Sequence, residues 1–258
     1  MPVFDHQGGR HIDVAGARIY TQTLGPEDAP VLVLLHGGFG TIEGFNGLLP
    51  ALDGWRLVGI DSRGHGASTL GGEPWTYQRV QEDVEQVLAA LGVRRASLLG
   101  FSDGGIVALR LGAAGRLAID RIAVIGATWH RDILQTTRPI LAGVTAESWR
   151  RKFPDTYADY QRLNPEPDFD RFARAVVGGW LDETPSGHPD ESVRRIQAPV
   201  LVVRGDTDHL VPLESTVALR QALPRAHLLN IPFAGHVAYE DAPEIFVPAL
   251  RRFLKEAD

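Results

Sequence analysis

The chain of 258 residues contains no cysteine. It therefore has no disulfide framework, no thiolate metal site and no cysteine nucleophile. No apolar stretch approaches the roughly 18 residues that a membrane-spanning helix needs. Residues 1–7 lack the basic region and apolar core of a secretory signal. We therefore expect a cytoplasmic protein that does not enter a membrane.

Sequence features of several binding functions are also missing. The formal net charge is −6 at pH 7 and the pI is about 5.8, with Lys and Arg scattered rather than clustered, so we expect no nucleic-acid partner. No His-Glu-x-x-His, G-x-G-x-x-G or P-loop occurs, so we expect no metal and no nucleotide cofactor. A small-molecule substrate is the expected partner, for a protein that is a monomer or a homodimer.

Short apolar runs alternate with helical patterns along most of the chain. Residues 10–24 alternate moderately and predict a hairpin of two strands. Continuous apolar runs are typical of strands that are covered on both faces, and they occur at 31–35, 57–60, 97–101, 122–125, 200–203 and 228–231. Helices are predicted at 41–52, 76–91, 213–222 and 243–255, and after residue 102. This alternation predicts an α/β fold with a mostly parallel, eight-stranded sheet and helices on both faces.

The alternation stops between residues 129 and 196. This segment has no strand-like run, and six prolines divide it into several short helices. It also carries aromatic residues that we expect to form mostly its own core, namely Trp149, Phe153, Tyr157, Tyr160, Phe169, Phe172 and Trp180.

One stretch carries the strongest chemical signal, the sequence Gly100-Phe101-Ser102-Asp103-Gly104. It has the form G-x-S-x-G, in which a serine lies on a sharp turn between a strand and a helix. A strand is predicted before it and a helix after it, as that turn requires. Such a tight turn presses the residues on either side of the serine together, so both flanking glycines must lack a Cβ. The Ser102 hydroxyl then lies at the positive end of the following helix.

A serine nucleophile needs a base that is oriented by an acid. In a parallel sheet these partners are expected just after later strands. Residues 205–212 follow one such strand and offer Asp206 and Asp208, while His236 follows the last strand. Of the nine histidines, His236 is the one at the appropriate strand end. The chain order Ser, acid, His is the order of the nucleophile-elbow hydrolases.

Together these motifs resemble the α/β-hydrolase fold superfamily over nearly the whole chain. They comprise the His36-Gly37-Gly38 loop, the Asp61-x-Arg63-Gly64-x-Gly66-x-Ser68 loop, the serine turn, the Gly205-x-x-Asp208-x-x-x-Pro212 loop and Gly235-His236. The resemblance implies a catalytic triad of Ser102, Asp208 and His236, with Asp206 capping its turn. It also implies a core domain of residues 1–128 and 197–258, with 129–196 as a helical cap inserted after the sixth strand.

The reaction needs donors for the charge that develops on the substrate oxygen. The backbone N–H groups of Asp103, directly after the nucleophile, and of Phe39, in the His-Gly-Gly loop, are the predicted oxyanion hole. We interpret His36, Asp61, Arg63 and Ser68 as residues that shape their loops.

The Asp103 side chain is open to two interpretations. A carboxylate in the first turn of a helix gains stability from the helix dipole. Alternatively, the side chain binds a cationic group of the substrate. The second interpretation follows a resemblance of Gly100–Gly105 to the Gly-Trp-Ser-Asp-Gly-Gly turn of the biphenyl-hydrolase-like enzymes (valacyclovir hydrolases), which cleave α-amino acid esters.

The sequence therefore predicts a cofactor-independent serine hydrolase that cleaves a small carboxylic ester or lactone through an acyl-enzyme, with an α-amino acid ester as one candidate. A C–C bond hydrolase, a haloperoxidase-like enzyme and a slow-turnover ligand receptor are the alternatives on the same fold. Dehalogenase and epoxide-hydrolase relatives carry a carboxylate nucleophile at the position of Ser102, which argues against their chemistry.

Overall fold

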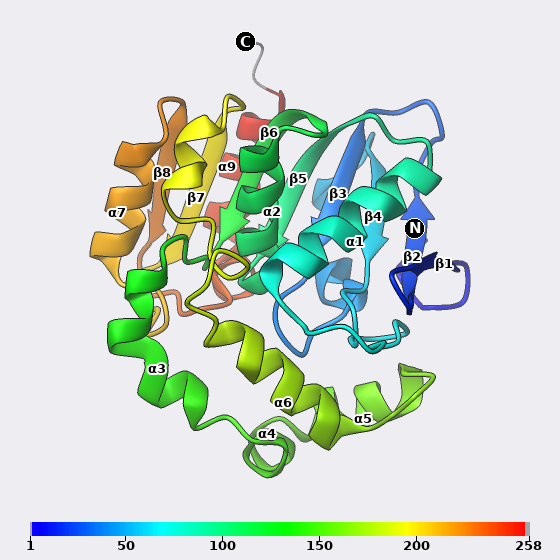
Figure 1. Cartoon of the computed structure of the whole chain (residues 1–258). Helices are drawn as coiled ribbons and strands as arrows, with labels where there is room; N and C mark the ends of the chain where they lie inside the picture. The colour runs from blue at the N-terminus through cyan, green and yellow to red at the C-terminus, as the bar shows by residue number, and fades with distance from the viewer. Residues whose placement is uncertain (1, 256–258) are drawn as a thin grey trace.

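The computed structural model describes residues 2–255 and contains one eight-stranded sheet (Figure 1). The strands are β1 (Arg10–Val14), β2 (Ala17–Leu24), β3 (Val31–Leu35), β4 (Arg56–Ile60), β5 (Arg95–Phe101), β6 (Ala118–Ile125), β7 (Val200–Gly205) and β8 (Ala226–Ile231). Their order across the sheet is β1-β2-β4-β3-β5-β6-β7-β8. The first two strands pair antiparallel, β2 also pairs antiparallel with β4, and all other pairs are parallel. The predicted fold class is confirmed.

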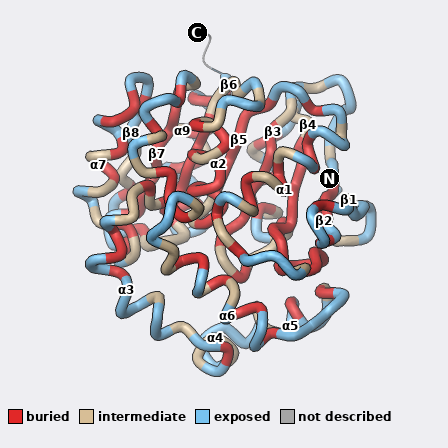
Figure 2. The backbone as a smooth tube through the Cα atoms, in the orientation of Figure 1, coloured by how far each residue is buried: buried red, intermediate tan, exposed pale blue. Residues whose placement is uncertain are grey.

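Alternate residues of the central strands enter two separate apolar clusters, one on each face of the sheet. Val33, Leu98 and Val124 belong to one cluster, while Leu34 and Leu99 belong to the other. This division follows from the two-residue period of a strand. Figure 2 shows the resulting buried sheet inside a more exposed layer of helices and loops.

Helices cover both faces of the sheet. On one face lie α1 (Tyr77–Ala90), α2 (Asp103–Ala114), η3 (Asp190–Arg195) and α7 (Leu213–Ala222), whose apolar residues join the first cluster. On the other lie η1 (Ile42–Ala51), α8 (Ala238–Asp241) and α9 (Pro243–Lys255), which join the second. None of the helices within residues 2–255 has the length and apolar character that crossing a bilayer would require.

The helix predicted at 41–52 is present in the structure. Residues Ile42–Ala51 form a 3₁₀ helix rather than an α-helix. Gly44, Gly47 and Pro50 lie within it, and glycine and proline are the weakest α-helix formers. The N-cap is Thr41, whose side chain accepts a hydrogen bond from the Glu43 N–H.

Residues 129–196, called the insert below, leave the sheet after β6 and return at β7. They form η2 (Arg131–Ile133), α3 (Leu134–Ala142), α4 (Ala146–Lys152), α5 (Pro154–Leu163) and α6 (Phe169–Trp180), followed by η3. In Figure 1 helices α3–α6 lie together below the sheet, at the carboxyl ends of the parallel strands. The Asn164 side-chain amide donates to the carbonyl oxygens of Gly64, Gly66 and Ser68, which fastens the insert to the loop after β4.

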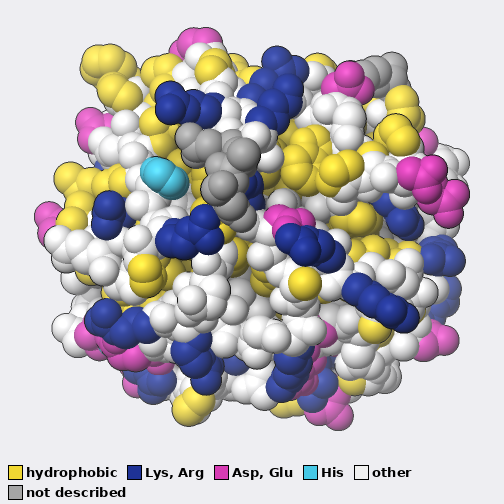
Figure 3. Space-filling model, turned by 90° about the horizontal axis from the view of Figure 1, so that it is seen from above, with side chains coloured by type: hydrophobic (Ala, Val, Ile, Leu, Met, Phe, Trp, Pro, Cys, Tyr) yellow, Lys and Arg dark blue, Asp and Glu magenta, His cyan; other side chains and the backbone are white. Residues whose placement is uncertain are grey.

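The surface opposite the insert has mixed charge. Figure 3 views this face and shows basic and acidic side chains interspersed with apolar and uncharged atoms.

Candidate active site

Ser102 occupies the turn between β5 and α2 in a conformation that few non-glycine residues adopt, with φ 50° and ψ −116°. Backbone strain of this kind concentrates at functional sites. A Cβ on Gly100 would overlap the carbonyl group of Gly104, as the sequence analysis expects. A Cβ on Gly104 would instead overlap the carbonyl of Leu35, at the end of β3. The second glycine is thus required by the neighbouring strand, which the sequence analysis did not identify.

The structure brings Ser102, His236 and Asp208 together, although they are far apart in the sequence. His236 Nε2 lies 3.0 Å from Ser102 Oγ, and His236 Nδ1 lies 2.8 Å from Asp208 Oδ2. A neutral imidazole that donates its Nδ1–H to a carboxylate leaves Nε2 as an acceptor for the serine hydroxyl. The three side chains therefore form one hydrogen-bonded series, the geometry that a serine nucleophile, its base and an orienting acid require.

Asp208 is held in its ionised form by its hydrogen bonds. The residue is 4% exposed, and burial alone would raise its pKa. Hydrogen bonds from His236 and from the backbone N–H groups of Leu210 and Val211 outweigh this effect and lower the pKa below its ordinary value. The other candidate acid, Asp206, is exposed and accepts a hydrogen bond from Asn230 instead.

The His-Gly-Gly loop, here called the oxyanion turn (residues 36–41), follows β3 and faces the serine turn. The Gly40 N–H donates to the Gly37 carbonyl at 3.1 Å, which places Phe39 at the tip with φ 59°. Asp103 is the first residue of α2, so its N–H has no acceptor within the helix. Phe39, Ser102 and Asp103 line the same cavity.

That cavity has a volume of about 420 Å³ and lies between the core and the insert. Apolar side chains line it on the insert side, where Ile140, Leu141, Val144, Trp149 and Phe153 contribute. Polar residues also line the cavity: Tyr77, Asp103 and Thr128 come from the core, and His188 comes from the insert. A cavity of this size and character fits a small, mainly apolar organic molecule that carries a few polar groups.

The Asp103 carboxylate lies in this cavity with two protein donors. The Tyr77 hydroxyl donates to Oδ1 and the Trp180 indole N–H donates to Oδ2, each at 2.8 Å. The side chain is largely buried, and burial raises its pKa in spite of these hydrogen bonds. Neither Tyr77 nor Trp180 is recognisable as a site residue from the sequence. Tyr77 has the helical spacing of an ordinary core residue, and Trp180 has the apolar character of one.

His188 belongs to the insert and lines the cavity. Its Nε2 lies 2.9 Å from the Thr128 hydroxyl, while no hydrogen-bond partner is recorded for its Nδ1 among residues 2–255. Burial lowers its pKa to about 4, so the imidazole is neutral at pH 7. No sequence motif marks His188 as a site residue. Its contact with Thr128 arises only because the insert folds back toward the residue directly before its own start.

The residues interpreted as loop-shaping are indeed held in structural contacts. His36 Nδ1 lies 2.7 Å from the Gly37 carbonyl oxygen, and His36 Nε2 accepts the Ser62 N–H at 2.9 Å. The Arg63 guanidinium makes a buried, bidentate ion pair with Asp83. Ser68 donates its hydroxyl hydrogen to the Asp61 carbonyl.

The structure also bears on metal binding. Within residues 2–255 no group of three or more His, Asp or Glu side chains is arranged to hold a metal ion.

Comparison with known proteins identifies the family of the chain. The sequence profile of the alpha/beta hydrolase family matches residues 32–249, which is most of the chain. The chain belongs to this family. The matched region of this alpha/beta hydrolase contains the serine turn, both acid candidates and His236.

Individual relatives have different recorded activities. The chain is 26% identical to 3-oxoadipate enol-lactonase 1 of Acinetobacter baylyi, covering 93% of this chain and 94% of the relative. It is 25% identical to 2-hydroxymuconate semialdehyde hydrolase of Pseudomonas putida, covering 97% and 95%. Among solved structures, a hydrolase from Pseudomonas aeruginosa PA01 matches with a TM-score of 0.77 and 25% identity, over 98% of this chain and all of that one. These comparisons establish the family, and the names of the relatives describe different activities.

Proposed function

We propose that this alpha/beta hydrolase is a cofactor-independent serine hydrolase that cleaves a small carboxylic ester or lactone. The observation that carries the proposal is the hydrogen-bonded series Ser102–His236–Asp208 at the wall of the cavity. Ser102 attacks the carbonyl carbon while His236 takes the hydroxyl proton, and Asp208 stabilises the imidazolium that forms. The N–H groups of Phe39 and Asp103 bind the oxyanion.

The acyl-enzyme is then resolved by water. His236 returns the first proton to the leaving alcohol, which departs as the serine ester forms. It next removes a proton from water, whose oxygen attacks the same carbonyl carbon, and Ser102 is regenerated as the acid product leaves. No cofactor is needed in either half of this sequence, because each step transfers only protons and an acyl group.

The cavity supports a substrate with an apolar acyl or alcohol part. In this proposal residues 129–196 act as a cap domain on a core of residues 1–128 and 197–258, because the cavity is lined from both. The similarity to an enol-lactonase favours an ester or lactone substrate. C–C bond hydrolysis is the second candidate, favoured by the similarity to 2-hydroxymuconate semialdehyde hydrolase at nearly full length.

A fluorophosphonate probe tests the nucleophile, because it reacts only with an activated serine. We expect one phosphonyl adduct per chain on Ser102, found by peptide mass spectrometry, and no adduct in Ser102→Ala. A panel of acyl esters, aminoacyl esters, lactones and a vinylogous 1,5-diketone then separates ester, lactone and C–C cleavage, with Ser102→Ala as the blank. A folded wild-type protein that stays unlabelled and inactive on the whole panel contradicts the proposal.

A further inference from the structure

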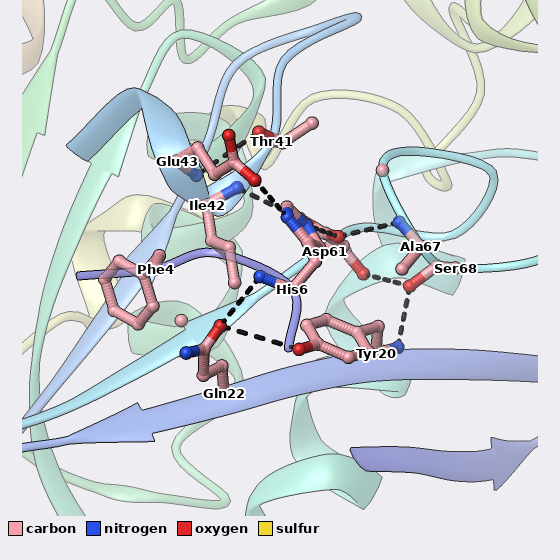
Figure 4. A network of polar contacts seen from close by, with 12 residues as sticks. Phe4, His6, Tyr20, Gln22, Thr41, Ile42, Glu43, Asp61, Ala67 and Ser68 are labelled. Carbon is pink, nitrogen blue, oxygen red and sulfur yellow. Dashed lines mark hydrogen bonds and ion pairs between the residues drawn. The ribbon is translucent and has the colours of Figure 1, made fainter. Parts of the chain in front are cut away.

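Residues 4–6 of the N-terminal segment lie between β2 and η1 and form hydrogen bonds with both elements. The Phe4 N–H and carbonyl pair with the Asn46 side chain, each at 2.9 Å. The N–H groups of Asp5 and His6 both donate to Gln22 Oε1 at 3.2 Å. Figure 4 shows the segment passing between β2 and η1 with the His6 ring turned inward. The segment is therefore a fixed part of the fold.

His6 bridges two carboxylates that come from different elements. Its Nδ1 lies 2.6 Å from Glu43 Oε1 in η1, and its Nε2 lies 2.7 Å from Asp61 Oδ2 in the loop after β4. The side chain is 4% exposed. A carboxylate only accepts hydrogen bonds and a neutral imidazole carries a single N–H, so an imidazolium is the form of His6 that satisfies both contacts.

The backbone of His6 adopts a left-handed conformation, with φ 58°. A residue other than glycine persists in this region only where its surroundings determine its position. Here the hydrogen bond to Gln22 and the contacts with the two carboxylates fix the position of His6.

The carboxylate of Asp61 connects this bridge to the oxyanion turn. Its Oδ1 accepts the Ile42 N–H at 3.0 Å, directly after the turn. The adjacent Ser62 donates its N–H to His36, the first residue of the turn. The loop after β4 thus forms hydrogen bonds at both ends of the oxyanion turn, whose tip is Phe39. His6 contacts that loop through Asp61 (Figure 4).

We propose that His6 is a positioning residue for the oxyanion hole: its imidazolium joins Glu43 to Asp61 and so fixes the turn that carries the Phe39 N–H. This inference rests on the proposed function. His6 touches neither the substrate cavity nor Ser102, so it acts through the turn alone.

The charges around His6 give the bridge a defined pH range. Burial on its own would lower the pKa of His6, but Asp61 and Glu43 outweigh it and raise the pKa above its ordinary value. The bridge is therefore complete below the ordinary histidine pKa and is lost as the pH rises through the raised value. Other ionisable groups around the bridge are Asp5, Tyr20, His36 and Arg162, the last lying 3.9 Å from Glu43.

The variant His6→Gln tests this role, because glutamine hydrogen-bonds but does not carry the charge. We expect the rate of Ser102 phosphonylation, and kcat on the best ester of the panel, to fall about tenfold at pH 7 with KM unchanged. This loss is smaller than the roughly 10²–10³-fold loss on removing an oxyanion donor outright. The wild-type rate should decline at alkaline pH as His6 loses its proton, and the variant should lack that decline.

His11→Gln is the matched control. His11 also packs against Tyr20 and hydrogen-bonds the Ala67 carbonyl at 2.9 Å, but it contacts no carboxylate that leads to the turn. We expect it to keep the wild-type rate and pH profile. Thermal unfolding of each variant separates a loss of rate from a loss of fold.

Imidazole NMR on the wild-type protein provides a measurement that needs no variant. We expect the His6 ring to carry both N–H protons at pH 7 and to titrate above the ordinary histidine range. A neutral His6 at pH 7, or a folded His6→Gln protein with the wild-type kcat and pH profile, overturns the inference alone. A wild-type protein that the probe does not label overturns the proposed function, and the positioning role with it.

Discussion

Asp103 contributes to the site with two different groups. Its backbone N–H is proposed to bind the oxyanion, while its carboxylate is held by Tyr77 from α1 and Trp180 from the insert. A carboxylate has about four acceptor positions, and these two donors occupy one on each oxygen. The remaining positions leave room for a donor on the substrate, so an ammonium group is compatible with the protein contacts already present.

One prediction for Asp103 concerns the charge of the substrate. If the Asp103 carboxylate pairs with a substrate ammonium, kcat/KM for an α-amino ester should exceed that for its deaminated analogue by about tenfold or more, because a hydrogen bond to a buried charged group contributes roughly 1.5–3 kcal/mol. Asp103→Asn should remove the preference. Initial-rate kinetics on the matched pair of esters measures both ratios.

Asp206→Asn supplies the control, since it makes the same change at an exposed acid in the neighbouring loop. Equal kcat/KM values for the two esters in the wild type would contradict ammonium binding. In that event the carboxylate serves to join Tyr77 and Trp180 across the boundary between core and insert.

The sequence allowed the prediction of a site residue where a motif fixes its place relative to a strand end. Ser102, Asp208 and His236 lie together in the structure because the parallel sheet brings the carboxyl ends of its strands to one edge. Trp180 and His188 were not predictable, because their position depends on how the insert folds back over the sheet. His6 carries no motif at all, and its contacts join residues 37 and 55 positions away.

At the scale of elements, the serine turn depends on the fit between α2 and the end of β3. Gly104→Ala places a Cβ against the carbonyl of Leu35, a backbone atom inside the central sheet that has no room to shift. We expect a destabilisation of about 1–3 kcal/mol or more from this overpacking. Loss of probe labelling should accompany it, because the strand, the turn and the oxyanion turn are all displaced. Urea unfolding and labelling kinetics measure the two effects.

Gly178→Ala is the matched control within an α-helix. It lies in α6, and an added Cβ there meets no atom within 4 Å. Alanine should stabilise that helix by up to about 1 kcal/mol, since glycine is the poorer helix former. A Gly104→Ala protein as stable and as reactive as the wild type would show that the turn has more freedom than this packing implies.

Element type was predictable where one pattern dominates, and less so where patterns compete. Apolar runs predicted six of the eight strands, because a strand buried on both faces must be apolar throughout, and the alternation at residues 10–24 predicted the other two. Ile42–Ala51 has helix-like apolar spacing together with two glycines and a proline, and the local backbone preference decided in favour of a 3₁₀ helix.

For the whole molecule, three of the buried ionisable groups, His6, His188 and Asp208, link folding to pH in separate ranges. His6 has a raised pKa, so its stabilising contribution is present below the ordinary histidine pKa and is lost as the pH rises through the raised value. Asp208 has a lowered pKa, so its contribution is present above about 4 and is lost as the pH falls through the lowered value. His188 changes the free energy of unfolding between these two pH ranges. We therefore expect the free energy of unfolding to be greatest near neutral pH.

The His188 contribution yields the most direct stability prediction. In the unfolded chain this histidine binds a proton below about pH 6.5, whereas burial lowers its pKa in the folded protein to about 4. The unfolded state therefore binds more protons between these values, and the free energy of unfolding should fall by about 3 kcal/mol as the pH drops across that range. His188→Gln removes this contribution and should make this part of the profile less steep, while His36 and His65, whose pKa values burial also lowers, contribute to the slope that remains.

Urea unfolding at several pH values between 4 and 7 measures the slope for each protein. His227→Gln removes a histidine from the exposed side of β8 and should retain the wild-type slope. If His188→Gln also retains it, the imidazole is protonated in the folded protein at mildly acidic pH. The side of the cavity formed by Thr128, Tyr77 and Asp103 would then gain a positive charge beside the Asp103 carboxylate, and an ammonium substrate would bind less well as the pH falls.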